Sequence, residues 1–436
     1  MPNPGQTENS AHSWQVAVLF VLSVIGAGIG YASSIIAARL LGAAAFENYA
    51  VAVATLGLAA SIAEAGVGKY GLKVLPAFTS SRQWSLASGY LRFGIGLSLL
   101  ISLILAVTVI LRRGIDINEL WGHPVGIAMF FLPAIAMSGV GVDFVMANRA
   151  AITGSFIARI IIPGTTLLIL IAFAYREQQM SAGTAVASFG AGSVVGMFLC
   201  YLTFRRSSEP DVFTASPSFD RRLWLRECAN FALTGFLMTW IFRVSIVILE
   251  ILPIPESEVG IFAAALETGC LILLLSKSTD KLFQPDLSII IQERNVELGE
   301  KMRSRRHFLI GIGCIAFLSF IAVGGRRVLG LYGEEFRSGY PTLCFVSVGA
   351  CVWTLFSLAP TYLRFVGLST FVIVATVSAA VSMAILTAVL GMQYGSTGAG
   401  AAFCIVVSLL AVTFFVYARR NLQAMRTQDK AQPASE

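Results

Sequence analysis

The chain has 436 residues, of which 56% are hydrophobic and 13% are charged, and its mean hydropathy is +0.77. Soluble domains carry about 25% charged residues, so this composition excludes an ordinary water-soluble enzyme. The net charge of +7 does not indicate a nucleic-acid partner, because in so apolar a chain the distribution of basic residues among the connections is more informative.

A membrane-spanning helix needs about 20 mainly apolar residues. The sequence contains twelve apolar runs of roughly that length, at residues 14–38, 46–66, 87–111, 125–147, 151–174, 182–203, 228–250, 258–279, 307–325, 341–363, 369–391 and 396–418. We therefore expect an all-α integral membrane protein with twelve transmembrane helices. Residues 1–13 contain no Lys or Arg, so the first run is predicted to be a retained helix rather than a signal peptide.

Lys and Arg are concentrated in every second connection between the expected helices. With a cytoplasmic N-terminus, 21 of the 31 basic residues fall in cytoplasmic connections, 7 fall in external ones, and 3 fall inside spans: Arg92, Arg159 and Arg243. Positively charged connections stay on the cytoplasmic side. We therefore expect a multi-pass protein of the inner (plasma) membrane with both termini in the cytoplasm.

The clearest break in the chain is rich in Ser and Pro and separates the sixth run from the seventh. It ends in Phe219–Trp224, which predicts a short basic amphipathic helix at the membrane interface. We expect it to link two lobes of six helices each. The expected divisions are an N-terminal tail, an N-lobe, the linker, a C-lobe and a C-terminal tail, at residues 1–13, 14–203, 204–227, 228–418 and 419–436.

The two halves share a weak pattern. Phe46-Glu47-Asn48-Tyr49 opens the second run and Glu258-Val259-Gly260-Ile261-Phe262 opens the eighth, and each run ends in two lysines followed by a proline. Because six spans is an even number, such repeats would be related by a pseudo-two-fold axis along the membrane normal, with a central cavity between the lobes. Chance is the alternative, since basic residues after a span are expected in any case.

Charged residues deep in the membrane are the main candidates for function. At 1.5 Å per residue, Arg243 lies about 22 Å from the cytoplasmic edge of a core about 30 Å thick, and Glu267 lies about 14 Å from the other edge. One interpretation is a buried ion pair between neighbouring helices. The other is that Arg243 faces the cavity and binds an anionic substrate group while Glu267 orients it, because the guanidinium fork donates two parallel hydrogen bonds to phosphate.

Four further charged residues are candidates nearer the cytoplasmic side. Arg159 lies about 12 Å deep, where it lines the cavity, snorkels to the interface or pairs with Asp143. Glu64 and Asp143 lie near helix ends, and either sit at the interface or, like Glu267, are candidates to bind a coupling proton or sodium ion. Lys277 would guide anionic head groups into a cytoplasmic entrance, although positive-inside topology explains it equally well.

Several chemistries are excluded by the sequence. The segment ending in Gly68-Lys69-Tyr70 is not an ATP-binding loop, because Ala63 replaces the first glycine and Tyr70 replaces the Ser or Thr that holds magnesium. The seven cysteines form no close pair and the three histidines are far apart, so no metal site is expected. No connection is long enough for a catalytic constellation. We expect a transporter rather than an enzyme.

Four motifs, in their order relative to the twelve expected helices, carry a family resemblance. They are Arg39-Leu40-Leu41-Gly42, Val259-Gly260-Ile261-Phe262, Pro285-Asp286-Leu287 and Leu331-Tyr332-Gly333-Glu334-Glu335-Phe336. In these motifs the chain resembles the multidrug/oligosaccharidyl-lipid/polysaccharide (MOP) exporter superfamily, whose fold is MATE-like. Within that superfamily it is most similar to the bacterial polysaccharide flippases.

The resemblance implies a substrate and a mechanism. The substrate would be an undecaprenyl-diphosphate-linked oligosaccharide repeat unit, moved from the cytoplasmic to the periplasmic leaflet by alternating access for O-antigen lipopolysaccharide or exopolysaccharide biosynthesis. A polysaccharide polymerase and glycosyltransferases would be partners, together with membrane lipids. No cofactor is expected, and a proton gradient, a sodium gradient or the membrane potential would supply energy.

Two alternatives remain. A MATE-type cation-coupled drug antiporter would have the same fold, but multidrug extruders of the superfamily typically carry acidic residues deep in the membrane, whereas the deepest charge in the seventh span is Arg243. A membrane polysaccharide polymerase or ligase normally needs a large periplasmic loop, which the sequence lacks. We therefore predict that Arg243, Arg159 and Lys277 neutralise a diphosphate in the cavity.

Overall fold

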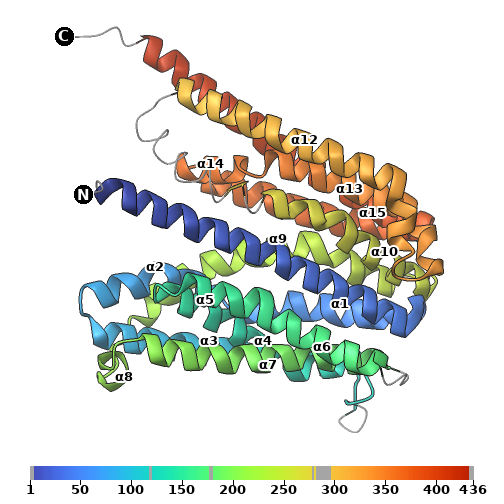
Figure 1. The fold of residues 1–436 in the computed structure, drawn as a ribbon, viewed down its shortest axis with the longest axis horizontal. Coiled ribbons are helices and arrows are strands. Elements are labelled where there is room, and N and C mark those ends of the chain that lie inside the picture. The colour runs from blue at the N-terminus through green and yellow to red at the C-terminus, as the bar shows by residue number, and fades with distance from the viewer. Residues whose placement is uncertain (1–3, 117–119, 176–179, 277–278, 281–295, 432–436) are drawn as a thin grey trace. The chain divides into compact units, whose positions relative to one another are not determined.

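The computed structural model describes residues 4–116, 120–175, 180–276, 279–280 and 296–431. Across these residues every regular element is a helix, and none is a strand (Figure 1). Helices satisfy all their backbone hydrogen bonds internally, which is what a chain in a bilayer requires because lipid offers no partners. The expected all-α architecture is confirmed.

The chain divides into two compact units, Met1–Glu250 and Ile251–Glu436. The helices of the first unit are α1 (Pro4–Ala63), α2 (Val67–Ser80), α3 (Trp84–Arg113), α4 (Pro124–Ala147), α5 (Ala151–Phe156), η2 (Ile157–Ile161), α6 (Ile162–Tyr175), α7 (Ala182–Ser207), α8 (Asp211–Thr214) and α9 (Arg221–Ile251). Those of the second unit are α10 (Glu256–Gly269), η3 (Cys270–Ile272), α12 (Val296–Leu329), η4 (Glu334–Gly339), α13 (Tyr340–Phe356), α14 (Ala359–Phe365) and α15 (Ser369–Ala431).

The division between the units falls after α9, whereas the sequence places it in the linker before that helix. Contacts along α9 join it to the first unit. Arg113 of α3 donates to both carboxylate oxygens of Glu250, at 2.5 Å and 2.8 Å, and the backbone of α9 at Ala232 packs against Gly66. Such a two-pronged ion pair fixes the orientation of both side chains.

The amphipathic helix expected at Phe219–Trp224 is not a separate element. Helix α9 starts at Arg221 and continues without interruption to Ile251. Trp224 is 1% exposed and stacks edge-on against Tyr90, with their ring centroids 5.3 Å apart. The tryptophan therefore packs in the protein interior, and the expectation of a helix lying at the membrane interface was wrong for this residue.

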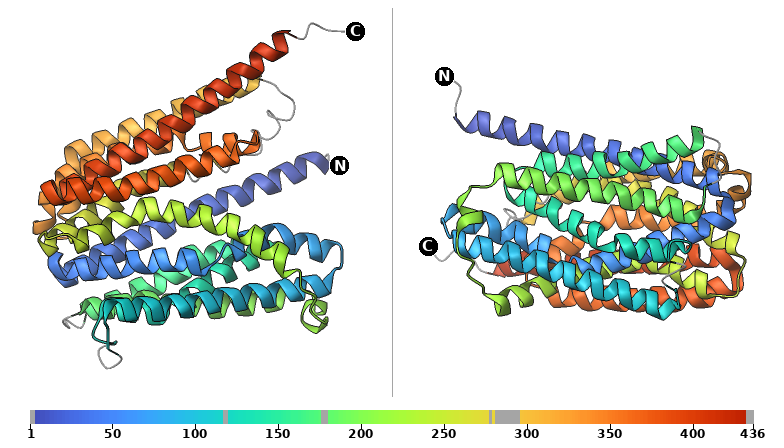
Figure 2. Two further views of the ribbon diagram at one scale, coloured as in Figure 1. Left: turned by 180° about the vertical axis from the view of Figure 1, so that it is seen from behind. Right: turned by 90° about the horizontal axis from the view of Figure 1, so that it is seen from below.

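Helices α1 and α15 each contain one glycine with non-helical torsion angles. Gly42 has φ 74° and ψ 168°, and Gly395 has φ 56° and ψ −136°. Both are positive-φ conformations that glycine adopts at little cost. Figures 1 and 2 show that each helix doubles back, and both glycines fall where the sequence predicts short connections between apolar runs.

The described residues contain ten helical segments that are long and apolar enough to cross a membrane. Two of these segments, Ala17–Ser80 and Ser369–Gln423, hold the kinked helices, and each is long enough for two crossings. The segments are therefore consistent with the twelve spans expected from hydropathy.

Helix α4 lies at the centre of the first unit and packs closely on α7 through small residues. A Cβ atom on Gly141 of α4 would lie 2.9 Å from the Cβ of Cys200 on α7. On α7, a Cβ atom on Gly192 would lie 2.5 Å from the carbonyl oxygen of Ile162, at the start of α6. Such close backbone approaches replace the hydrophobic effect as the source of helix association in lipid. The approach at Gly141 fixes α4 on α7, and the approach at Gly192 fixes α7 on α6.

Candidate functional site

The turn between α1 and α2 begins the candidate site. Ala65 and Gly66, in the turn between the end of α1 at Ala63 and the start of α2 at Val67, both have positive φ, at 50° and 68°. A Cβ atom on Gly66 would overlap the carbonyl oxygen of Cys228 and lie 2.6 Å from the backbone nitrogen of Ala232. Only glycine fits at this position, so the turn is fixed against α9. It places Glu64 and Lys69 on either side of the turn.

Lys69 of α2 pairs with Asp143 of α4. Its Nζ lies 2.8 Å from Oδ1 of Asp143, and the lysine side chain is 57% exposed whereas the aspartate side chain is 7% exposed. Asp143 approaches α2 closely, because a Cβ atom on Gly68 would lie 2.8 Å from the Cβ of Asp143. The pair thus joins a buried carboxylate to a cation that reaches the surface. Asp143 does not pair with Arg159, so that alternative from the sequence was wrong.

Glu64 lies next to this pair on the same face of α4. Its carboxylate packs against Gly139, since a Cβ atom there would lie 3.1 Å from Cδ of Glu64. Gly139 and Asp143 are four residues apart on α4 and therefore share a face. Both Lys69 and Asp143 interact electrostatically with Glu64, whose carboxylate has no hydrogen bond or ion pair to another residue in the described part of the chain. Lys69 thus pairs with Asp143, and the Glu64 carboxylate lies beside that pair.

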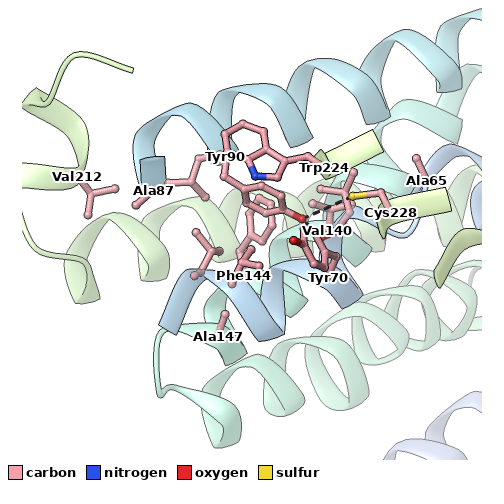
Figure 3. Packing of buried hydrophobic residues seen from close by; sticks show 14 residues of the cluster. Ala65, Tyr70, Ala87, Tyr90, Val140, Phe144, Ala147, Val212, Trp224 and Cys228 are labelled. Carbon is pink, nitrogen blue, oxygen red and sulfur yellow. Dashed lines mark hydrogen bonds between the residues drawn. The ribbon is translucent and has the colours of Figure 1, made fainter. Parts of the chain in front are cut away.

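An aromatic cluster fixes the helices around these charges (Figure 3). The hydroxyl of Tyr90 donates to the carbonyl oxygen of Val67 at 2.7 Å and lies 3.8 Å from Sγ of Cys228. The ring of Tyr90 meets those of Phe144 and Trp224 edge-on, with centroids 6.3 Å and 5.3 Å apart. Edge-to-face aromatic pairs favour fixed geometry. The cluster therefore ties α2, α3, α4 and α9 together beside the Lys69–Asp143 pair.

Arg159 lies in η2, a single turn of π-helix between α5 and α6. Its backbone packs against the first half of α1, where a Cβ atom on Gly26 would lie 2.5 Å from the Arg159 carbonyl oxygen and 2.8 Å from its Cβ. The side chain is half-buried and has no ion pair or hydrogen bond among the described residues of the first unit. Turns of π-helix are rare and occur frequently at functional sites.

Arg243 lies in α9 and packs against the second half of α1. A Cβ atom on Gly57 would lie 3.1 Å from Cδ, 3.2 Å from Nε and 3.7 Å from Cζ of Arg243. The half-buried side chain has no ion pair within the described residues of the first unit. Each arginine thus contacts a glycine of α1, and glycine at these positions leaves room for the approach.

The remaining two candidates, Glu267 and Lys277, do not lie in the first unit. Glu267 lies in α10 of the second unit, where it is exposed, while Arg243 lies in the first unit. Lys277 falls outside the described residues. The structure therefore brings together Glu64 and Asp143 from the predicted set and adds Lys69 to them. In the sequence Lys69 falls in an expected cytoplasmic connection, and nothing there indicated its pairing with Asp143.

The chain resembles solved structures of one fold. No protein-family profile matches it, and no curated protein sequence matches it significantly. A multidrug resistance MATE family transporter of the MOP superfamily, solved in an inward-facing conformation, is 16% identical and superimposes with a TM-score of 0.70 over 94% of this chain and 99% of its own. The chain has the MATE transporter fold.

Two other solved structures share this fold with the chain. A MATE protein in complex with MaL6 is 16% identical, with a TM-score of 0.63 over 94% of this chain and 96% of its own. A MOP superfamily transporter from Pyrococcus furiosus, described as having a binding pocket whose reverse polarity suggests a different function, is 15% identical, with a TM-score of 0.61 over the same shares. The chain is therefore a multi-pass membrane protein with a transporter fold.

Proposed function

We propose that the chain transports an anionic lipid-linked oligosaccharide across the inner membrane and that arginines bind the diphosphate of this substrate. The observation that carries the proposal is the seating of Arg243 and Arg159 against glycines of α1, with no acidic partner among the described residues of the first unit. A charge inside a spanning helix costs several kcal/mol unless it meets protein, water or a ligand. An anionic substrate group supplies the missing counter-charge.

The chemistry of the two side chains suits a diphosphate. Each guanidinium donates paired hydrogen bonds to phosphate oxygens and keeps its charge at every physiological pH. The lipid tail would stay in the bilayer while the sugar crosses through the protein. The Pyrococcus furiosus relative, whose pocket is described as having reverse polarity, supports the idea that the sign of the pocket charge distinguishes functions on this fold.

Substitution of Arg243 tests the proposal. In cells that depend on this chain for polysaccharide export, Arg243→Ala is expected to abolish surface polysaccharide while Arg243→Lys keeps part of it, because lysine retains the charge without the bidentate geometry. Arg92→Ala is the matched control, since Arg92 is also an arginine in a spanning segment but is exposed. Membrane insertion is measured for all three variants. Wild-type export by the alanine variant would refute the assignment.

A cation-coupled drug antiporter is the second candidate. The chain's similarity in fold to a multidrug resistance transporter supports it, as does the group of Glu64 and Asp143, which suits proton or sodium binding. The antiporter would lower drug accumulation when expressed in a drug-sensitive host and would tolerate Arg243→Ala. The flippase would leave drug accumulation unchanged and would lose export in the same variant.

The proposal also covers the orientation of the chain in the membrane and the energy source for transport. Both termini would lie in the cytoplasm, which reporter fusions to each terminus can test. A proton or sodium gradient, or the membrane potential, would drive transport, and a polysaccharide polymerase and glycosyltransferases would act before or after it. Counterflow in proteoliposomes under one imposed gradient at a time separates these energy sources.

A further inference from the structure

The second unit contains a pocket that the proposed function does not use. It lies among the start of α12, the end of α13, α14 and the end of α15, and encloses a cavity of about 70 Å³. Its lining residues are Met302, Arg303, Arg306, His307, Phe356, Leu358, Ala359, Tyr362, Phe415, Ala418, Arg419 and Leu422. Among the residues that the structure describes, three arginines and no carboxylate line the pocket.

The wall of the pocket is aromatic. Phe356 and Phe415 stack with ring centroids 4.4 Å apart, and His307 meets each of them edge-on at 5.7 Å. The guanidinium of Arg303 lies over the ring of Phe415, with its Cζ 6.0 Å from the centroid. The pocket therefore combines an apolar wall with cations at its edge.

Arg306 is the buried cation of the pocket. The residue is 1% exposed, and its Nη2 lies 2.5 Å from Oδ1 of Asp280. Its Nη1 donates to the carbonyl oxygen of Leu355 at 3.0 Å and its Nη2 to Oγ of Ser357 at 2.7 Å. The Nε–H is buried and has no partner among the residues that the structure describes. A buried donor without a partner points to a missing acceptor.

The pocket also lies at one membrane boundary. The candidate spans Met302–Leu329, Glu334–Phe365 and Ser369–Gln423 start or end within about two helical turns of its lining residues. Lipid head groups lie at this depth, next to the apolar core. Basic pockets between spanning helices bind anionic head groups.

We propose that this pocket binds one anionic phospholipid. The phosphate accepts hydrogen bonds from Arg303, Arg419 and the free Nε–H of Arg306, and an acyl chain packs along Phe356 and Phe415. A lipid rather than a free anion is the occupant, because a small anion would leave the aromatic wall uncovered. The site lies wholly within the second unit, so it is independent of Arg243 and Arg159.

The test removes two charges at the pocket and two beside it. In the purified full-length chain, binding of phosphatidylglycerol is measured by native mass spectrometry and by thermal stabilisation. Arg303→Gln with Arg419→Gln is expected to weaken binding by roughly 10-fold or more. Arg305→Gln with Arg420→Gln removes the same charge from exposed neighbouring positions on the same helices and is expected to change binding less than about 2-fold.

Two further arms identify the ligand chemistry. Phosphatidylcholine should bind much more weakly than phosphatidylglycerol, and inorganic phosphate at millimolar concentration should not displace the lipid. Equal loss of binding in the two double variants would overturn the site. Equal binding of phosphatidylcholine would overturn the requirement for an anionic head group, and displacement by phosphate would overturn the lipid as occupant.

Discussion

The side chain of Arg243 on α9 lies directly over Gly57 on the second half of α1. A Cβ atom on Gly57 would lie 3.1 Å from Cδ and 3.2 Å from Nε of the arginine. These distances are tighter than ordinary van der Waals contacts, so any larger residue must displace the arginine. The glycine therefore sets the position of the guanidinium.

Gly57→Ala should impair transport without unfolding the protein. The added methyl group pushes the Arg243 side chain away, while alanine stabilises a helix by up to about 1 kcal/mol relative to glycine. We expect transport to fall several-fold with an unchanged or slightly raised melting temperature in detergent. Gly235→Ala on α9 is the control, since a Cβ atom there meets nothing within 4 Å. Full transport by Gly57→Ala would show that the position of Arg243 is unimportant.

The Lys69–Asp143 pair should respond unequally to the loss of either partner. Lys69→Met leaves a buried carboxylate without its cation, whereas Asp143→Asn leaves a lysine that already reaches the surface. We expect Lys69→Met to cost about 1–2 kcal/mol, reduced from a fully buried pair by the exposure of the lysine, and Asp143→Asn to cost less.

A double-mutant cycle, measured by thermal unfolding, checks this asymmetry. The double variant Lys69→Met with Asp143→Asn should recover part of the stability lost in Lys69→Met alone. Lys73→Met removes an exposed lysine one turn further along α2 and should have little effect. Additive losses in the double variant would mean that the two side chains do not stabilise each other.

Glu64 is the carboxylate in this group without an ion-pair partner among the described residues. If it carries the coupling proton, Glu64→Gln should remove the acceleration of transport by an imposed pH gradient in proteoliposomes. Exchange of substrate without a gradient should persist, because glutamine keeps the shape of the side chain. Glu209→Gln, which changes an exposed acidic residue, is the control. A normal response to the gradient in Glu64→Gln would exclude this role.

Gly26 and Gly28 on α1 make a matched pair for testing the contact with the π-helical turn. A Cβ atom on Gly26 would lie 2.5 Å from the carbonyl oxygen of Arg159, while one on Gly28 would meet nothing within 4 Å. Backbone atoms cannot move aside as a side chain does, so Gly26→Ala should destabilise the protein by about 1–3 kcal/mol. Gly28→Ala should be neutral or stabilising in the same thermal unfolding measurement.

Hydropathy predicted the fold well because span length is set by the bilayer. The kinks at Gly42 and Gly395 fall in gaps between apolar runs, so the positions of both reversals could be read from the sequence. The long helix α9 was harder to predict. Its basic start at Arg221 is typical of an interfacial segment, but Trp224 packs into a tertiary cluster that hydropathy does not describe.

From the sequence, charged residues could be compared only by their depth along a helix. Depth does not show which side of the helix a residue lies on. Asp143, for example, pairs with Lys69 on α2 and not with Arg159. Arg306 was counted only as a marker of topology, but it is buried and pairs with Asp280. Which side of a helix faces its neighbour depends on close contacts such as those at Gly68 and Gly139, and these need the structure.

The reversals in α1 and α15 bear on how the protein is made. Each joins two apolar segments through a single non-helical glycine, and in α15 the backbone N–H of Ser396 donates to the Glu258 carboxylate at 2.8 Å just after the turn. Because the connection is so short, the two apolar segments have no hydrophilic loop between them that could cross the membrane as a separate step. We therefore expect the first two and the last two crossings to enter the bilayer as helical hairpins during synthesis. Epitope tags inserted at Gly42 or Gly395 should then block membrane integration far more than tags at either terminus.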